Sequence, residues 1–210
     1  GKQMTLKRNE SYHAKFETKI NEIEIDLMPD KLTTRSLTGS GILDVFYSSF
    51  YDEGLKTITK SQTNKIDYAT DEYTFLAINY DNAILNKKAV RRALSFGINR
   101  EKLRDDVYMS HASCAYLPIH PDAWGYNGNN TVPNDPNLPK KLLNEEGFSD
   151  VDNNSILEKY ENDVKTELKF TLLSIDTPLK RSVCNTLVTN LEENGIQLNV
   201  GDCTKEEFTI

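Results

Sequence analysis

The chain has 210 residues, of which 38% are hydrophobic, and it carries a formal net charge of -7. This composition suits one or two modest globular cores. The acidic balance argues against a nucleic-acid binder, because neutralising phosphates requires a concentrated basic surface. No stretch approaches the ~18 consecutive apolar residues of a membrane span. The opening residues lack the basic-then-apolar layout of a signal peptide, so the chain is either cytosolic or a mature piece whose signal segment lies outside it.

Cysteine and histidine form no catalytic or metal-binding pattern. The three cysteines, Cys114, Cys184 and Cys203, are odd in number and widely spaced, so neither a disulfide framework nor a zinc motif is predicted. No G-x-S-x-G, H-E-x-x-H, Walker or glycine-rich nucleotide motif occurs, and the three histidines are scattered along the chain. The sequence therefore gives no sign of an enzyme.

The first third of the chain has the pattern of strands separated by short helices. Apolar and polar residues alternate over residues 20–27, which is the period of a strand with one solvent-facing side. Residues 29–37 can form a short helix, and residues 42–47 form an apolar run that predicts a second strand. Further strands are predicted over residues 55–59 and 73–79. These lengths describe an α/β or mixed α+β layer.

Beyond residue 79 the pattern changes to helices. Residues 86–96 carry apolar and basic side chains on opposite sides, which predicts an amphipathic helix. Asn99 is a plausible N-cap for a second helix over residues 100–108. A loop rich in proline, glycine and asparagine is predicted over residues 118–139, and a short helix follows it up to Gly147.

The last quarter of the chain predicts a βαβ unit. Residues 167–173 form the first strand, and Thr177 can cap a helix whose first residue is Pro178. Gly195 ends this helix, and residues 196–200 form the second strand. Such a unit almost always crosses over right-handed, and its two strands are expected to be parallel.

The most specific segment is the sequence KAVRRALSFGINREKL at residues 88–103, which follows LAIN at residues 76–79. It closely resembles the V-R-x-A-L-x-x-A-I-D-R-E-x-I signature of family 5 of the extracellular solute-binding proteins, which serve peptide, dipeptide and nickel ABC importers. Gly97 and Asn99 stand where that family usually has alanine and aspartate. Asparagine caps a helix about as well as aspartate, so the second change keeps the local physics.

Other landmarks of the same family occur in the family's order. The opening MTLKRNESY resembles its L-x-R-N-x-x-Y strand, and LTGSGILDV at residues 37–45 resembles its helix, glycine turn and following strand. KKLLNEEGF at residues 140–148 is similar to its K-x-L-L-x-E-A-G-F helix, with Glu146 in place of alanine. The resemblance spans nearly the whole chain.

The resemblance implies a periplasmic-binding-protein-like type II fold, of which this chain is a fragment comprising parts of two lobes. Residues 1–78 are expected to belong to the first lobe, and residues 79–210 to the second, with the βαβ unit at its end. It also implies an extracytoplasmic location, as a cell-surface lipoprotein or a periplasmic protein, and two partners, a peptide ligand and a membrane permease.

In the family, ligand is held between the lobes, so candidate ligand-binding residues lie near the ends of strands. Hydroxyl and aromatic side chains there could hold the backbone and side chains of an extended peptide. The candidates are Tyr47, Ser48, Ser49, Tyr73 and Phe75. For each residue alone, half-buried sheet packing is the more common role.

A second constellation nearly matches the calcium loop D-x-[DN]-x-[DN]-G-x5-E. Oxygen-bearing side chains occupy its positions 1, 3, 5, 9 and 12, and they are Asp150, Asp152, Asn154, Glu158 and Glu161. Position 6 is Ser155 where glycine is needed for the sharp turn, which is expected to strain the loop. A polar turn between a helix and a strand explains the same residues, so both interpretations stay open. No cofactor other than calcium is predicted.

The leading hypothesis is a binding protein that captures oligopeptides or dipeptides outside the membrane and delivers them to a permease. The first alternative is a binder of nickel or another small solute on the same fold. A hydrolase that reuses the scaffold is an alternative from a different class, since a fold does not fix a function.

Overall fold

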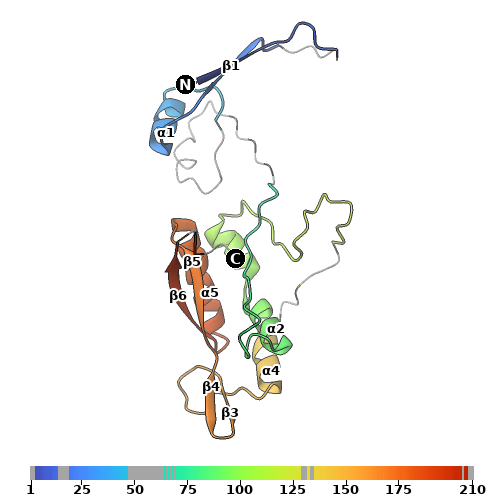
Figure 1. Ribbon diagram of the computed structural model, residues 1–210, viewed down its shortest axis with the longest axis vertical. Coiled ribbons are helices and arrows are strands. Elements are labelled where there is room, and N and C mark those ends of the chain that lie inside the picture. The colour runs from blue at the N-terminus through green and yellow to red at the C-terminus, as the bar shows by residue number, and fades with distance from the viewer. Residues whose placement is uncertain are drawn as a thin grey trace. The chain divides into compact units, whose positions relative to one another are not determined.

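The computed structural model describes residues 3–13, 19–46, 64, 66, 68, 70–128, 132, 135–204 and 206–207 (Figure 1). The chain divides into two compact units, Gly1–Ile66 and Asp67–Ile210. Across the described part of the chain, no helix combines the length and the apolar character needed to cross a membrane. Both units contain helices and strands, as the mixed sequence pattern predicts.

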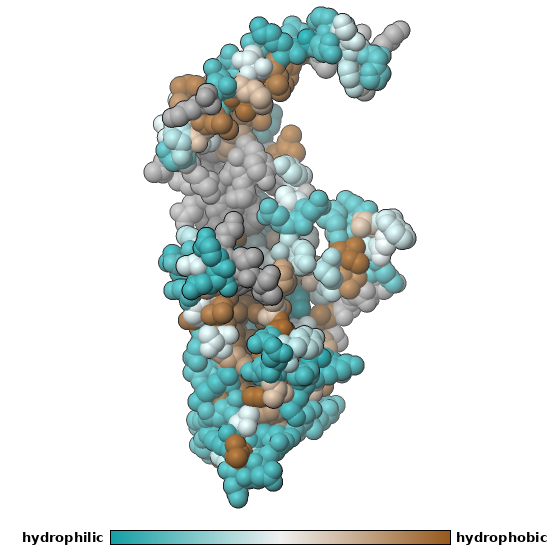
Figure 2. Space-filling model, in the orientation of Figure 1, coloured by the Kyte–Doolittle hydropathy of each residue, from teal (hydrophilic) through white to brown (hydrophobic). Residues whose placement is uncertain are grey.

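The first unit begins with a two-stranded antiparallel sheet made of β1 (Gln3–Lys7) and β2 (Glu22–Asp26). The strand predicted over residues 20–27 is therefore confirmed. The register places Met4 opposite Ile25 and Leu6 opposite Ile23, so that four apolar side chains share one face. All four are exposed, and Figure 2 shows apolar atoms at the surface of this unit. The sheet has an apolar face that no described residue covers.

The predicted helix after Pro29 is confirmed as α1 (Lys31–Gly39). Asp30 caps it, because its carboxylate accepts hydrogen bonds from the backbone N–H of Thr33 at 2.7 Å and from the hydroxyl of Thr33 at 2.9 Å. These contacts satisfy one of the N–H groups that the first turn of a helix leaves unpaired.

The strand predicted over residues 42–47 is wrong for its described part, residues 42–46, which are irregular. A strand needs a neighbouring strand to pair its N–H and C=O groups, and no described residue provides one here. Residue 47 and the strand predicted over residues 55–59 lie outside the described residues.

The strand predicted over residues 73–79 is also wrong, since residues 72–79 form an irregular segment at the start of the second unit. Among the described residues, no backbone-to-backbone hydrogen bond involves residues 70–79. The segment is held through a side chain instead, because the hydroxyls of Thr74 and Tyr108 lie 2.9 Å apart.

Two predicted helices follow this segment. The first is α2 (Lys88–Gly97), which buries Val90, Ala93 and Leu94. Gly97, where the resembled family has alanine, lies close to the last helix of the chain, and a Cβ there would lie 3.1 Å from the Cδ2 of Leu191. The missing side chain therefore allows a close approach of the two helices.

The second predicted helix begins as α3 (Arg100–Lys102) and continues as the π-helical turn η2 (Leu103–Val107). Asn99 caps it as predicted, since its side chain accepts a hydrogen bond from the N–H of Lys102 at 2.9 Å. The N–H of Asn99 itself donates to the side chain of the buried Asn190 at 2.9 Å. The cap is thereby joined to the last helix.

After the predicted loop comes α4 (Leu138–Glu145), which packs against α2 and ends just before Gly147, as predicted. A hairpin then forms from β3 (Glu158–Glu161) and β4 (Val164–Glu167). The two residues between these strands have positive φ angles, 50° for Asn162 and 62° for Asp163. Such angles are typical of a tight hairpin turn, which the sequence interpretation missed.

The predicted βαβ unit is confirmed. It consists of β5 (Lys169–Ile175), α5 (Pro178–Glu192) and β6 (Gln197–Cys203), with the two strands parallel. Thr177 caps α5 through a hydrogen bond from the N–H of Lys180 at 3.2 Å. The predicted first strand over residues 167–173 is split, because residue 167 ends β4 and β5 begins at Lys169.

The core of the second unit lies between α2, α4, α5 and β5 (Figure 1). Its completely buried members come from both helices and loops, and they are Val90, Ala93, Leu143, Leu168, Leu191 and Ile196. A smaller cluster of Val107, Val183 and Leu187 joins η2 to α5. Cys184 is buried on α5.

Candidate functional site

Of the predicted ligand-binding residues, Tyr73 and Phe75 lie in the described part of the chain and form an exposed aromatic pair. Their side chains are 51% and 68% exposed, and their ring centroids lie 5.3 Å apart with the planes tilted by 36°. The predicted half-buried sheet packing is not what the structure has here. Exposed rings in this arrangement can cover an apolar side chain of a ligand, and the phenol can also donate a hydrogen bond.

Tyr47, Ser48 and Ser49 lie outside the described residues. Their assignment to a ligand site therefore stays a prediction.

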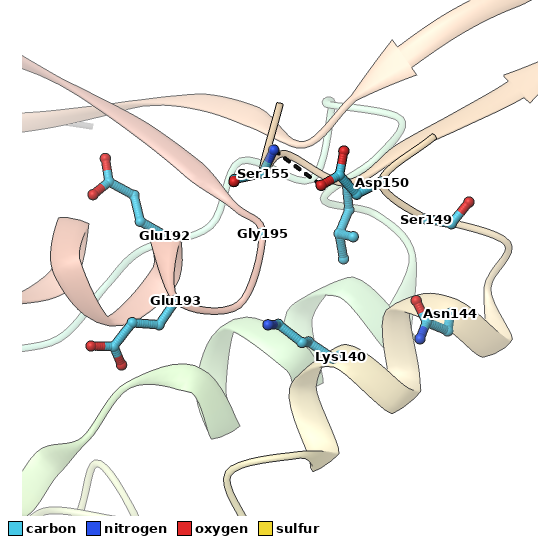
Figure 3. Close-up of a pocket in the computed structure, with 9 residues that line it drawn as sticks. Lys140, Asn144, Ser149, Asp150, Ser155, Glu192, Glu193 and Gly195 are labelled. Atoms are coloured by element: carbon cyan, nitrogen blue, oxygen red, sulfur yellow. Dashed lines mark hydrogen bonds between the residues drawn. The ribbon is translucent and has the colours of Figure 1, made fainter. Parts of the chain in front are cut away.

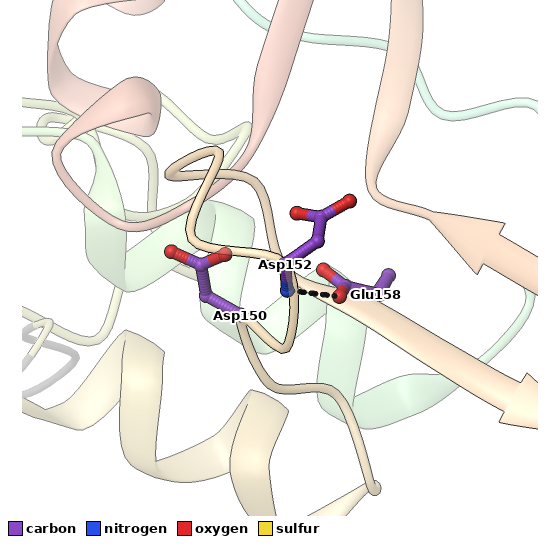
Figure 4. A group of neighbouring side chains, drawn as sticks. All are labelled: Asp150, Asp152 and Glu158. Atoms are coloured by element: carbon purple, nitrogen blue, oxygen red, sulfur yellow. Dashed lines mark hydrogen bonds between the residues drawn. The ribbon is translucent and has the colours of Figure 1, made fainter.

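Three of the five predicted calcium ligands are brought together in the second unit. Oxygen atoms of Asp150, Asp152 and Glu158 all lie within 4.8 Å of one another (Figure 4). The two aspartates are exposed and Glu158 is completely buried. Oε1 of Glu158 accepts hydrogen bonds from the N–H of Val151 at 2.8 Å and of Asp152 at 3.3 Å, which fixes the carboxylate.

The loop is built around its own carboxylates. Asp150 accepts hydrogen bonds from the N–H groups of Asn154 at 3.0 Å and Ser155 at 3.1 Å. Asp152 accepts a further one from the N–H of Asn154 at 3.2 Å. Asn153 and Ser155 have φ angles of 58° and 69°, so Ser155 does take the left-handed conformation that glycine would favour at this position. The turn forms despite its side chain.

The other two predicted ligands have different partners. The side-chain oxygen of Asn154 accepts a hydrogen bond from the N–H of Ile156 at 2.8 Å. Glu161 lies on β3 and forms an ion pair with Lys159 at 2.6 Å, which lowers the pKa of this glutamate. Glu161 is thereby engaged along its own strand.

Positive charge near the loop comes from the β3–β4 hairpin. The ammonium group of Lys165 contacts carboxylate oxygens of both Asp152 and Glu167, and these hydrogen bonds raise the pKa of Lys165. Hydrogen bonds from Lys165 and Lys169 lower the pKa of Glu167 to about 2. Among the described residues, no lysine, arginine or histidine nitrogen forms an ion pair with Asp150 or Glu158.

A recess of about 480 Å³ lies beside this loop (Figure 3). Its walls come from α4, from the loop and from the turn between α5 and β6, and they include Lys140, Asp150, Ser155, Glu192 and Glu193. Its lining residues carry three carboxylates and one ammonium group, so acidic groups predominate in it. Asp150 of the loop is one of the residues that line it.

The sequence matches the family described as bacterial extracellular solute-binding proteins, family 5 middle, over residues 1–206. It is 27% identical over 167 residues to the oligopeptide-binding protein AppA of Bacillus subtilis, covering 76% of this chain and 30% of that protein. It is 28% identical over 169 residues to the nickel-binding periplasmic protein of Escherichia coli, covering 78% and 32%. It is 24% identical over 135 residues to heme-binding protein A of Haemophilus influenzae, covering 64% and 25%. The chain thus spans about a third or less of each curated relative.

Solved structures support the same fold. The ABC transporter substrate-binding protein CtaP of Listeria monocytogenes matches all of the chain with a TM-score of 0.80 at 18% identity. The AppA protein of Bacillus subtilis in complex with a nonapeptide matches 99% of the chain with a TM-score of 0.61 at 23% identity. The chain covers 40% and 41% of these two structures. The predicted fold, a fragment of a periplasmic-binding-protein-like type II protein, is confirmed.

Proposed function

The chain belongs to the bacterial extracellular solute-binding proteins of family 5, and we propose on this premise that the protein is the substrate-binding component of an ABC importer. In this proposal it captures oligopeptides or dipeptides outside the membrane and delivers them to the permease. The observation that carries the proposal is the family match over residues 1–206. Members of this family are transport proteins, and we propose no catalytic activity for this one.

The exposed pair of Tyr73 and Phe75 supports a peptide as the ligand. Their rings are positioned to cover an apolar side chain, and the backbone of residues 70–79 makes no hydrogen bond to another described backbone group. An extended peptide can pair with the backbone N–H and C=O groups of such a segment while aromatic rings contact its side chains. We therefore assign these two residues to the ligand site, together with Tyr47, Ser48 and Ser49.

The test is to incubate the purified protein with a mixed pool of di- to decapeptides and to identify the retained molecules by mass spectrometry. We expect peptides to be retained. Retention of no peptide at all would reject the proposal.

Variants then locate the site. We expect Tyr73→Ala combined with Phe75→Ala to weaken binding of a retained peptide at least about tenfold, because truncating a central aromatic contact commonly costs more than about 1 kcal/mol. Tyr160→Ala is the matched control, because Tyr160 is as exposed as Tyr73 but lies on β3. Equal losses in both variants would contradict the assignment of the site.

The second candidate is a binder of nickel or another small solute. It is favoured by the similarity to the nickel-binding protein of Escherichia coli. Elemental analysis of the protein as purified distinguishes the two candidates, because stoichiometric nickel without bound peptide would support the second and exclude the first.

The location is also part of the proposal. The family is described as extracellular, and we propose a cell-surface lipoprotein or a periplasmic protein. Cell fractionation tests this, since the protein would be recovered with the envelope or periplasm. We further assign residues 1–78 to one lobe of the protein and residues 79–210 to the other.

A further inference from the structure

We propose that residues 150–158 form a calcium site, in which Asp150, Asp152 and the buried Glu158 bind one Ca²⁺ ion. The inference does not depend on the ligand of the protein, because it stands on the loop alone. Three observations carry it: an unsatisfied buried oxygen, an uncompensated negative charge, and a spacing of oxygens that fits this ion.

The first observation is the carboxylate of Glu158. The residue is 0% exposed, and within the described part of the chain its buried Oε2 has no hydrogen-bond partner. Its other oxygen is fixed by two backbone N–H groups, so the side chain cannot turn away without losing both bonds. A buried carboxylate oxygen without a donor or a cation is costly, and such groups in proteins are normally paired or bound to a metal. In Figure 4 this carboxylate lies beside those of Asp150 and Asp152.

The second observation is the charge. Three carboxylates lie together, whereas the one ammonium group in contact with them, among the described residues, is that of Lys165. Lys165 contacts Asp152 and is shared with Glu167, which lies outside the cluster. A divalent cation would neutralise most of the remaining charge. Calcium has a strong preference for such oxygen ligands.

The third observation is the spacing. All three oxygens lie within 4.8 Å of one another. Ca²⁺ binds oxygen at about 2.3–2.6 Å, so oxygens up to about 4.8 Å apart can bind the same ion. One calcium ion can therefore reach all three oxygens. Backbone carbonyls of the loop and water can supply the remaining ligands, as they do in other calcium loops.

The alternative, a polar turn that binds nothing, leaves one fact unexplained. Loop N–H groups donate hydrogen bonds to oxygens of Asp150 and Asp152. No group of the described residues donates one to Oε2 of Glu158. The recess described above is lined by Asp150, one of the three proposed ligands (Figure 3). The bound ion would fasten the start of β3 to the loop and so stabilise the second unit.

The experiment is a calorimetric titration of the EDTA-treated protein with CaCl₂, with MgCl₂ in a parallel titration. We expect one Ca²⁺ site per chain and at least tenfold weaker binding of Mg²⁺. The melting temperature is expected to rise by several degrees at a calcium concentration of about 100 times the dissociation constant. No calcium binding, or binding of both ions with equal affinity, would overturn the proposal.

Variants identify the ligands. Asp150→Asn and Glu158→Gln are expected to weaken calcium binding at least tenfold, and melting in EDTA shows whether each variant is folded. Glu161→Gln is the matched control, because Glu161 is paired with Lys159 and its loss should leave the affinity unchanged. Ser155→Gly should bind calcium more tightly, since glycine adopts a φ of 69° without strain. Equal losses for Glu158→Gln and Glu161→Gln would refute the assignment of the ligands.

Discussion

The two units of the chain differ in what their secondary structure buries. In the second unit, helices and strands enclose a core in which Leu143, Leu168 and Leu191 are completely buried. In the described part of the first unit, β1 and β2 have a regular register and a uniform apolar face, yet every residue of both strands is exposed. The comparison shows that a correct hydrophobic pattern forms strands but does not by itself provide a core. A two-stranded sheet needs a further layer to be stable in water.

The largest expected difference in stability between the two units is seen when one leucine in each is truncated. Leu143→Ala is expected to lower the free energy of unfolding by about 2–5 kcal/mol, because it leaves a cavity in a packed core. Leu6→Ala should change it by less than about 0.5 kcal/mol, as exposed substitutions do. Urea denaturation measures both. A loss of similar size for Leu6→Ala would show that the apolar face of β1 and β2 is covered in the folded protein.

A smaller difference in stability is expected when one glycine in each unit is replaced by alanine. Gly195 has a φ of 77°, and a Cβ there would lie 2.5 Å from the Cγ of Leu157. Gly195→Ala should therefore cost at least about 1–3 kcal/mol through strain and displacement of the buried leucine. Gly39→Ala, in α1, is the control, because no atom of the described residues would lie within 4 Å of the added Cβ and alanine favours helices. Thermal unfolding of both variants tests this, and equal destabilisation would contradict it.

The smallest effect concerns acid stability of the second unit. The pKa of Glu167 is about 2 in the folded protein, below its ordinary value of 4.5, because Lys165 and Lys169 donate hydrogen bonds to it. A depressed pKa means that this glutamate stabilises the fold above about pH 4.5 and that the contribution is lost as the pH falls toward 2. Glu167→Gln should flatten the acid side of the stability profile over this interval. An unchanged profile in urea unfolding experiments would contradict the role of the cluster.

Much of the fold of the second unit could be predicted from local signals. Asn99 and Thr177 cap helices as expected, and the apolar spacing of α2 and α5 places their buried faces correctly. These signals act within a few residues, so they survive without knowledge of distant partners. The parallel pairing of β5 and β6 was predicted from the βαβ pattern, in which a helix connects two neighbouring strands.

The errors arose where structure depends on a partner far along the chain. Residues 42–46 and 73–79 have the composition of strands but find no pairing strand among the described residues. The β3–β4 hairpin was missed for the opposite reason, because its strands are mostly polar and carry little hydrophobic alternation. Its signal was the Asn162–Asp163 pair, two residues that tolerate the left-handed conformation of a tight turn.

In the candidate sites, too, the features set by nearby residues were predictable and those that depend on distant residues were not. The spacing of acidic residues led to Asp150, Asp152 and Glu158, which the structure brings together. It could not reveal that Glu158 is buried or that Glu161 pairs with Lys159, since both depend on the course of the chain after the loop. No sequence signal distinguished the exposure of Tyr73 and Phe75 from ordinary packing.

The two residues that flank the β3–β4 hairpin meet directly. The N–H of Leu168 donates to the carbonyl of Leu157 at 2.9 Å, and Leu157 in turn donates to the carbonyl of Gly195 at 2.8 Å. The hairpin therefore projects from the rest of the unit, and its two ends lie next to each other (Figure 1). Insertions or deletions at its tip need not disturb the parallel strands behind it. Length variation is expected to be tolerated there, and a reporter group could be attached at the same place.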